Sequence, residues 1–157
     1  MGLSASAHRV ADELARLGVT TTVVEMPSST RTAAEAAAAI GCEVAQIAKS
    51  LVFRAANSDR PVLVVASGAN RVDVTLLEAA LGEPVARADA DWVRATSGFA
   101  IGGVAPVGHL TAPVVFIDRD LLALPEVWAA AGTPNAVFRV LPAQLAEVTG
   151  ASVIRVQ

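Results

Sequence analysis

Two short apolar runs rich in β-branched residues constrain the fold more than any other feature of the sequence. They occupy residues 51–55 and 62–66, and the polar stretch from Asn57 to Pro61 separates them. Runs of this length, bounded by turn-forming residues, are typical of two strands joined in an antiparallel hairpin. A sheet built on this hairpin is antiparallel in at least one place.

Signals for helices and strands alternate on both sides of the hairpin. Thr32 and Glu35 have the spacing of a capping box, Gly41 stands where a helix stops, and Pro142 suits the first turn of a last helix. Helices are expected over residues 10–17, 32–41, 73–81, 89–96, 125–131 and 142–150, with a helical turn at 43–48. Strands are expected over residues 19–24, 51–55, 62–66, 84–87, 114–117, 136–140 and 152–156.

This order predicts an α/β (mixed α+β) fold. We expect a single domain over residues 1–157, with a mixed, partly antiparallel central sheet flanked by helices. Hydrophobic residues make up 54% of the chain and charged residues 17%, which is far from the composition of a disordered protein. The chain is therefore expected to fold on its own.

Charge and targeting signals limit the classes of partner. The net charge of −3 lacks the basic surplus of a protein that grips long stretches of nucleic acid, so DNA is not an expected partner. Residues 1–9 lack the apolar core of a secretory signal, which predicts a cytoplasmic protein. Residues 95–117 carry no Asp, Glu, Lys or Arg, but their glycines and prolines favour a buried loop running into a strand over a membrane span.

Neither a metal nor a cofactor is expected. Cys42 is the only cysteine, which excludes an internal disulfide and a multi-cysteine metal site and favours a packing residue over a nucleophile. Asp118 and Asp120 suit the cap of a turn better than a metal site. No P-loop, Rossmann glycine pattern or Ser-His-Asp arrangement is apparent.

Lys49 is the only lysine among the twelve basic residues. Apolar neighbours at 47–48 and 51–53 place it at a predicted helix-to-strand junction. Partial burial there strengthens the pull of an ammonium on a phosphate or carbonyl oxygen and lowers its pKa. The alternative, from the local sequence alone, is a side chain whose stem lies on apolar surface and whose amine stays in water.

The glycine-rich segment 96–109 is the second candidate feature. Gly102 and Gly103 let main-chain N–H groups approach an oxyanion or a phosphate, and the hydroxyls of Thr96 and Ser97 stand at the edge of the segment. A tight structural turn explains a glycine pair equally well. His109 is a candidate general base, although a structural role is commoner for a histidine beside a strand.

Taken together, these segments resemble the YbaK/EbsC family. The resemblance rests on Ala37–Gly41, Gln46–Phe53, Arg71–Asp73, the glycine-rich segment from Thr96 to Gly108, and Ala131–Gly132, and it spans about residues 20 to 151. Members of this family are free-standing, ProX-like aminoacyl-tRNA deacylases, similar to the editing domain of bacterial prolyl-tRNA synthetase.

The resemblance implies a hydrolase that removes a wrongly attached amino acid from tRNA, with tRNA(Pro) carrying cysteine or alanine as the expected substrate. The implied partners are the 3′ end of aminoacyl-tRNA and prolyl-tRNA synthetase. The functional lysine of the family falls on Lys49, the candidate catalytic residue. The residues expected to bind substrate are Ser50, Thr96, Ser97, Gly98, Gly102, Gly103, Val104, Pro106, His109 and Thr133.

Two positions depart from the cysteinyl-tRNA deacylase branch of the family. The chain has no tyrosine, and Val23 and Val24 stand in the region where that branch has one. Ala136 and Val137 stand where an aspartate is expected. Two alternatives therefore stay open: a module of the same fold that binds aminoacyl-tRNA or a nucleotide without turnover, and a small-molecule binder unrelated to tRNA.

Overall fold

A long hairpin forms the centre of the sheet, as the sequence predicts. In the computed structural model, which describes residues 3–157, β2 (Ile47–Ala55) pairs antiparallel with β3 (Pro61–Ser67). Strand β5 (Val114–Asp118) continues the sheet parallel to β3, and β8 (Ser152–Ile154) follows parallel to β5.

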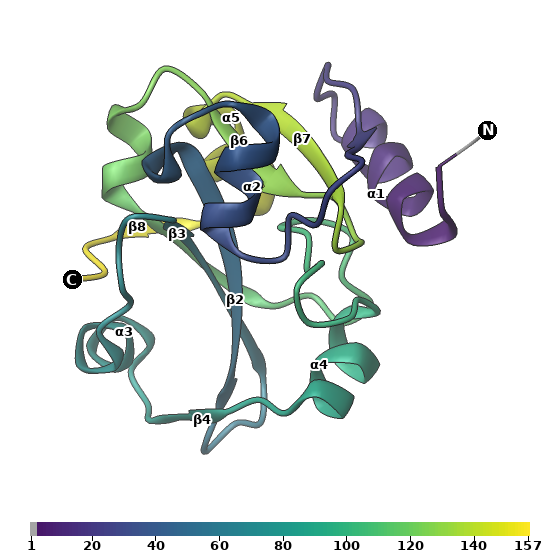
Figure 1. Cartoon of the computed structure of the whole chain (residues 1–157). Coiled ribbons are helices and arrows are strands. Elements are labelled where there is room, and N and C mark those ends of the chain that lie inside the picture. The colour runs from purple at the N-terminus through teal and green to yellow at the C-terminus, as the bar shows by residue number, and fades with distance from the viewer. Residues whose placement is uncertain (1–2) are drawn as a thin grey trace.

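Two separate strands lie along the other edge of β2. Strand β6 (Val127–Ala130) runs parallel to the start of β2, and β4 (Val85–Arg87) runs antiparallel to its end. Strands β7 (Ala136–Val140) and β1 (Val24–Glu25) extend the sheet beyond β6, each antiparallel to its neighbour. Within the described residues the order is β1-β7-β6-β2-β3-β5-β8, with β4 also beside β2 (Figure 1), so the predicted mixed sheet is confirmed.

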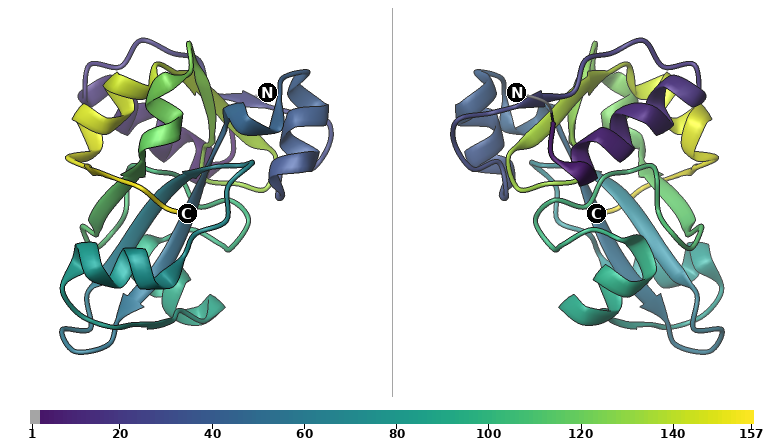
Figure 2. Two further views of the ribbon diagram at one scale, coloured as in Figure 1. Left: turned by 90° about the vertical axis from the view of Figure 1, so that its left-hand side faces the viewer. Right: turned by 90° about the vertical axis from the view of Figure 1, so that its right-hand side faces the viewer.

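Helices follow the capping signals of the sequence. The Thr32 hydroxyl accepts the Glu35 N–H at 3.1 Å, and the Asp89 carboxylate accepts the Trp92 N–H at 2.8 Å, so Asp89 is the cap of its helix. Figure 2 shows the helix that Thr32 caps at one margin of the molecule. The helices are α1 (Ala5–Arg16), α2 (Ala33–Ile40), α3 (Val74–Leu81), α4 (Ala90–Ser97) and α5 (Pro142–Thr149), with 3-10 turns η1 (Val44–Gln46) and η2 (Arg119–Ala123).

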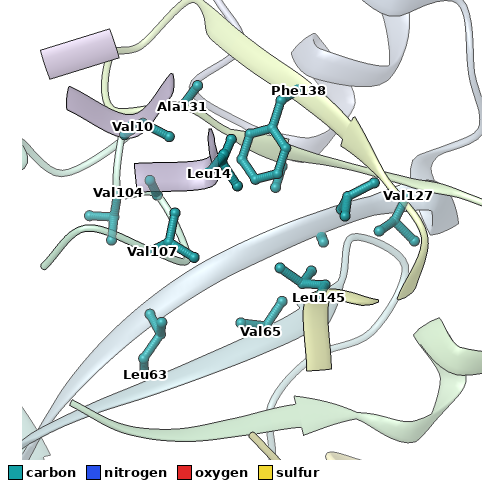
Figure 3. Packing of buried hydrophobic residues seen from close by; sticks show 14 of the residues in the cluster. Val10, Leu14, Leu63, Val65, Val104, Val107, Val127, Ala131, Phe138 and Leu145 are labelled. Atoms are coloured by element: carbon teal, nitrogen blue, oxygen red, sulfur yellow. The ribbon is translucent and has the colours of Figure 1, made fainter. Parts of the chain in front are cut away.

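Apolar side chains pack on both faces of the sheet. Alternate residues of a strand point to opposite faces. Leu63 and Val65 accordingly join a large cluster with α1, α5 and the glycine-rich segment (Figure 3), whereas Val62 and Val64 join a smaller cluster with Leu77 of α3. This two-sided burial explains why β3 is apolar at nearly every position.

The helix predicted over residues 125–131 is wrong, because Val127–Ala130 forms β6. Burial alternates along this strand, with Val127 and Ala129 buried and Trp128 and Ala130 half-buried. Alanine is the strongest helix former, but intrinsic helix propensity amounts to less than about 1 kcal/mol per residue, and the pairing of this segment between β2 and β7 outweighs it. The error matters for function because Trp128, which lies on β6, lines the pocket described below.

Other boundaries also differ from the prediction. Helix α1 begins at Ala5, five residues before the predicted start, and β8 ends at Ile154, two residues before the predicted end. The helical turn expected over 43–48 is confined to η1, and β2 already begins at Ile47, so Lys49 lies within a strand and not at a helix-to-strand junction. Of the strand expected over 19–24, only Val24 pairs, as the first residue of β1, although Val19 and Val23 are buried. Those two side chains fill the core without a strand partner.

The uncharged stretch 95–117 ends α4 and then forms a loop that enters β5, as predicted, but only the middle of this loop, residues 103–107, is buried throughout. Val104, Ala105 and Val107 are each at most 7% exposed. No helix among the described residues is long and apolar enough to cross a membrane.

Candidate active site

A gap in the sheet opens along one edge of β2. On that edge β6 pairs with Ile47 and Ala48, and β4 pairs with the strand from Phe53 onward. No strand of the described chain pairs with residues 49–52 there. The Ile47 carbonyl accepts the Gly68 N–H on the β3 side, so the alternation of an antiparallel ladder turns the N–H and C=O of Ser50 toward the gap.

A pocket of about 500 Å³ occupies this gap. All the residues from Ile47 to Phe53 line it, although their side chains alternate between the two faces, because the pocket runs along the strand edge. Its floor is apolar and buried, with Ala48 and Ala129 each 1% exposed. Its mouth includes the exposed residues Arg31 and Ile101.

Lys49 is the only charged residue of β2 that lines the pocket. Its ammonium donates a hydrogen bond to the Asn70 carbonyl at 2.6 Å, and no carboxylate of the described residues lies within ion-pair distance of it. Burial lowers the pKa of Lys49 below its ordinary value of 10.5, and the nearby positive charge of Arg71 lowers it further, whereas Asp118 opposes the shift. The positive charge of this ammonium is therefore not neutralised by direct contact.

A polar network behind Lys49 holds its partner in place. The Asn70 side-chain amide donates to the carboxylates of Asp118 and Asp120, both at 2.8 Å. Asp118 is 1% exposed and also accepts the main-chain N–H groups of Ser67 and Asp120, at 3.0 and 2.9 Å. The prediction that Asp118 caps a turn is confirmed, and the same carboxylate fixes the loop whose carbonyl orients the Lys49 ammonium.

The glycine pair is wedged between two other segments. Gly102 has φ +94°, and a side chain there would lie 2.6 Å from the Arg31 Cγ atom. At Gly103 a side chain would lie 2.7 Å from the Thr133 main chain, and the Gly103 N–H already donates to the Ala100 carbonyl at 3.0 Å. The pair thus permits close packing, and the Gly103 N–H serves a turn.

The structure gathers some of the predicted site residues and separates others. Lys49, Ser50, Gly102 and Val104 line the pocket. Thr96, Ser97, Gly98, Gly103, Pro106, His109 and Thr133 do not.

The residues outside the pocket have structural partners. The Ser97 hydroxyl donates to the Val93 carbonyl at 2.6 Å, and Gly98 ends α4 in the left-handed conformation. The main-chain carbonyl of Thr96 accepts the Thr111 N–H at 2.8 Å. The Thr133 hydroxyl donates to Asn135 Oδ1 at 3.0 Å and accepts the Ala136 N–H at 3.1 Å, which closes the turn before β7.

His109 and Pro106 line a different cavity, of about 380 Å³, beside α1. The His109 Nε2 atom lies 2.6 Å from the Ala105 carbonyl oxygen, and the ring contacts Phe99 edge to face. Burial lowers the pKa of His109 below its ordinary 6.5, and Arg9 adds to the shift. These contacts support the structural interpretation of His109.

Most of the pocket lining was not predicted from the sequence, and the two most informative omissions are Arg31 and Trp128. Trp128 was assigned to a helix that is in fact β6. The Thr32 capping box predicted where α2 begins, but no local signal in the sequence shows that Arg31, the residue before this cap, lines the pocket. Cys42 is partly buried against the small cluster beside α2, and burial raises the pKa of its thiol, in keeping with a packing role.

The pocket offers cations and main-chain groups to a ligand, but no carboxylate or histidine of residues 3–157 lines it. An arrangement of this kind can bind a phosphate, stabilise a developing oxyanion and hold a small apolar group on its floor. It supplies no side chain for general acid–base chemistry other than Lys49.

Comparison with known proteins identifies the class. Residues 27–148 match the model of the aminoacyl-tRNA editing domain, and the chain belongs to that family. It is similar to the YwhH protein of Bacillus subtilis (strain 168), which is uncharacterised, with 33% identity over 125 residues that cover 80% of this chain and 79% of YwhH.

Two solved structures share the whole fold. One, described as a candidate trans-editing enzyme for prolyl tRNA synthetase, is 48% identical with a TM-score of 0.93, and the match covers 99% of both chains. The other, the hypothetical protein APE2540, is 34% identical with a TM-score of 0.87, and the match covers 94% of this chain and 98% of that one.

Proposed function

We propose that this protein is a trans-editing hydrolase that deacylates mischarged tRNA, with tRNA(Pro) carrying a small amino acid such as cysteine or alanine as its substrate. The observation that carries the proposal is the pocket along the open edge of β2, in which the unpaired Lys49 ammonium lies among apolar walls. Membership of the editing-domain family supports it.

The chemistry requires little from the protein, because an aminoacyl ester is already reactive. Water attacks the ester carbonyl, the carbonyl oxygen becomes an oxyanion, and the bond to the ribose oxygen breaks while a proton passes to that oxygen. Lys49 binds the phosphate of the terminal adenosine or stabilises the oxyanion. The Ser50 N–H on the open edge is a second donor, and one such donor contributes roughly 10²- to 10³-fold in rate.

The shape of the pocket supports a small amino acid. The pocket has a volume of about 500 Å³ for both the adenosine and the aminoacyl group, which leaves little room for a large amino-acid side chain. The Ser50 carbonyl on the open edge is an acceptor for the α-ammonium of the amino acid. Recognition of the 3′ end alone fits a protein of net charge −3, and prolyl-tRNA synthetase is the partner that charges the tRNA.

A deacylation panel tests the proposal. Purified protein is incubated with tRNA(Pro) charged with proline, cysteine or alanine, and with tRNA(Ala) charged with alanine. Release of cysteine or alanine from tRNA(Pro), with proline left in place, is the expected result. If no mischarged tRNA loses its amino acid at enzyme concentrations equal to the substrate, the protein is not a deacylase.

The second candidate is a module that binds aminoacyl-tRNA without hydrolysing it. The absence of a carboxylate or histidine from the described lining of the pocket favours it. It predicts tight binding of an uncleavable aminoacyl-adenosine analogue together with no release of amino acid in the panel.

A further inference from the structure

Charge is distributed unevenly around the pocket. Acidic residues outnumber basic ones in the chain, 15 to 12, yet within the described part of the chain the only two charged residues that line the pocket are the cations Lys49 and Arg31. Lys49 lies on β2, partly buried, and Arg31 lies at the exposed mouth. The positive charges of Arg31 and Lys49 therefore lie one at the mouth of the pocket and one farther inside it.

The Arg31 side chain is seated against Gly102 but is not paired. A Cβ atom on Gly102 would lie 2.6 Å from Arg31 Cγ and 2.9 Å from Nε, so the absence of a side chain at Gly102 creates the surface on which Arg31 rests. Among residues 3–157 no carboxylate lies within 4.0 Å of its guanidinium, and no hydrogen bond from that group is found.

The backbone on both sides of Arg31 is anchored. Thr30 is 6% exposed and donates both its N–H and its hydroxyl to the Pro134 carbonyl, at 2.7 and 3.1 Å. Thr32 caps α2. A guanidinium on a fixed backbone loses less conformational entropy when it binds, and its planar fork matches two oxygens of a phosphate.

We propose that Arg31 is a second anion-binding residue, which holds a backbone phosphodiester of the RNA 3′ end at the mouth of the pocket while Lys49 acts deeper. The inference rests on the proposed function, because it takes an RNA 3′ end as the ligand. A strand that enters with its aminoacylated end first places that end at the floor and the preceding phosphodiester at the mouth.

Two uncleavable probes test the inference: an alanyl-amide analogue of adenosine without phosphate, and the same analogue at the 3′ end of a short single-stranded RNA ending in CCA. Dissociation constants are measured from low to moderate salt for wild type, Arg31→Ala and Arg16→Ala. Arg16 lies at the exposed end of α1, so its removal changes the net charge equally without touching the pocket.

For the RNA probe, Arg31→Ala is expected to weaken binding roughly ten-fold at low salt, as for the loss of one charge-assisted contact. The slope of log affinity against log salt is expected to fall in magnitude by about 0.7, the value for one phosphate of a single strand. Affinity for the nucleoside probe stays as in wild type, and Arg16→Ala behaves as wild type with both probes.

An unchanged salt slope for Arg31→Ala with the RNA probe overturns the inference, and so does an equal loss of affinity for both probes. In either case wild-type binding and deacylation leave the proposed function standing. If wild-type protein binds neither probe, the proposed function fails and the inference fails with it.

Discussion

At the scale of single residues, the environment of Lys49 explains why an arginine-rich chain has a lysine there. The ammonium is a compact charge that fits between the Asn70 carbonyl and the pocket, at 2.6 Å from the former. Its pKa is lowered because burial disfavours the charged form. The sequence predicted this burial and this shift, but it did not predict Asn70 or the Asp118 network, because those contacts join β2 to loops distant in the chain.

The lowered pKa of Lys49 predicts the pH dependence of ligand binding. Binding of an uncleavable aminoacyl-adenosine phosphate needs the ammonium, so affinity is expected to fall as pH rises, with a midpoint below 10.5. Lys49→Arg keeps its charge to higher pH and shifts the midpoint upward. Isothermal titration calorimetry between pH 7 and the alkaline limit of folding measures this; identical profiles for the two proteins contradict a role for the Lys49 charge.

His109 predicts a pH dependence of stability. Its folded-state pKa lies below 6.5, so the unfolded chain binds the proton first, and the stabilisation present above pH 6.5 is lost as pH falls through the lowered folded value. His109→Gln is expected to flatten the decline of the unfolding free energy below pH 6.5, measured by urea titration. His8→Gln, at an exposed position, is the control and retains the wild-type decline.

At the scale of elements, helices, turns and the hairpin that depend on neighbouring residues were predicted correctly. Elements that depend on the pairing of distant strands were not. The β2–β3 hairpin, the Thr32 cap and the glycine helix ends follow from a few adjacent residues. The strand β6 and the gap beside Ser50 do not, because each depends on which distant strands meet β2. Because the pocket results from that pairing, its lining residues could not be predicted from the local sequence.

Helix α2 forms one wall of the pocket, and its cap is predicted to couple stability to binding. Thr32→Ala removes the hydroxyl that accepts the Glu35 N–H and is expected to cost about 1 kcal/mol of unfolding free energy. It is also expected to weaken binding of the aminoacyl-adenosine analogue, because Thr32 itself lines the pocket together with Ala33, Ala36 and Ile40 of the helix that it caps.

Asp73→Ala is the matched control for this cap. Asp73 caps α3, which does not line the pocket, so the variant is expected to lose similar stability and retain full affinity. Denaturant titration measures the unfolding free energy of both variants, and calorimetry measures their affinity for the analogue. Equal affinities for the two variants contradict the assignment of α2 to the ligand site.

At the scale of the whole molecule, the pocket gathers segments that are far apart in the sequence: the entry to α2, strand β2, the glycine-rich segment and β6. Apolar clusters on both faces hold the sheet that carries them. The fold class and the central lysine were predictable from one sequence, because hydrophobic periodicity and the order of the family-like motifs can be recognised in the sequence itself. The pocket contains two cations and no carboxylate of the described residues. This charge distribution could not be predicted from the sequence, because it depends on how these distant segments come together.

The role of Lys49 is decided by the rate of deacylation of Ala-tRNA(Pro) under single-turnover conditions, measured for wild type and Lys49→Ala side by side. Wild type is expected to release alanine, and the variant, shown to be folded by its thermal unfolding transition, is expected to be slower by roughly 10²-fold or more. A folded Lys49→Ala protein that retains the wild-type rate would contradict that role.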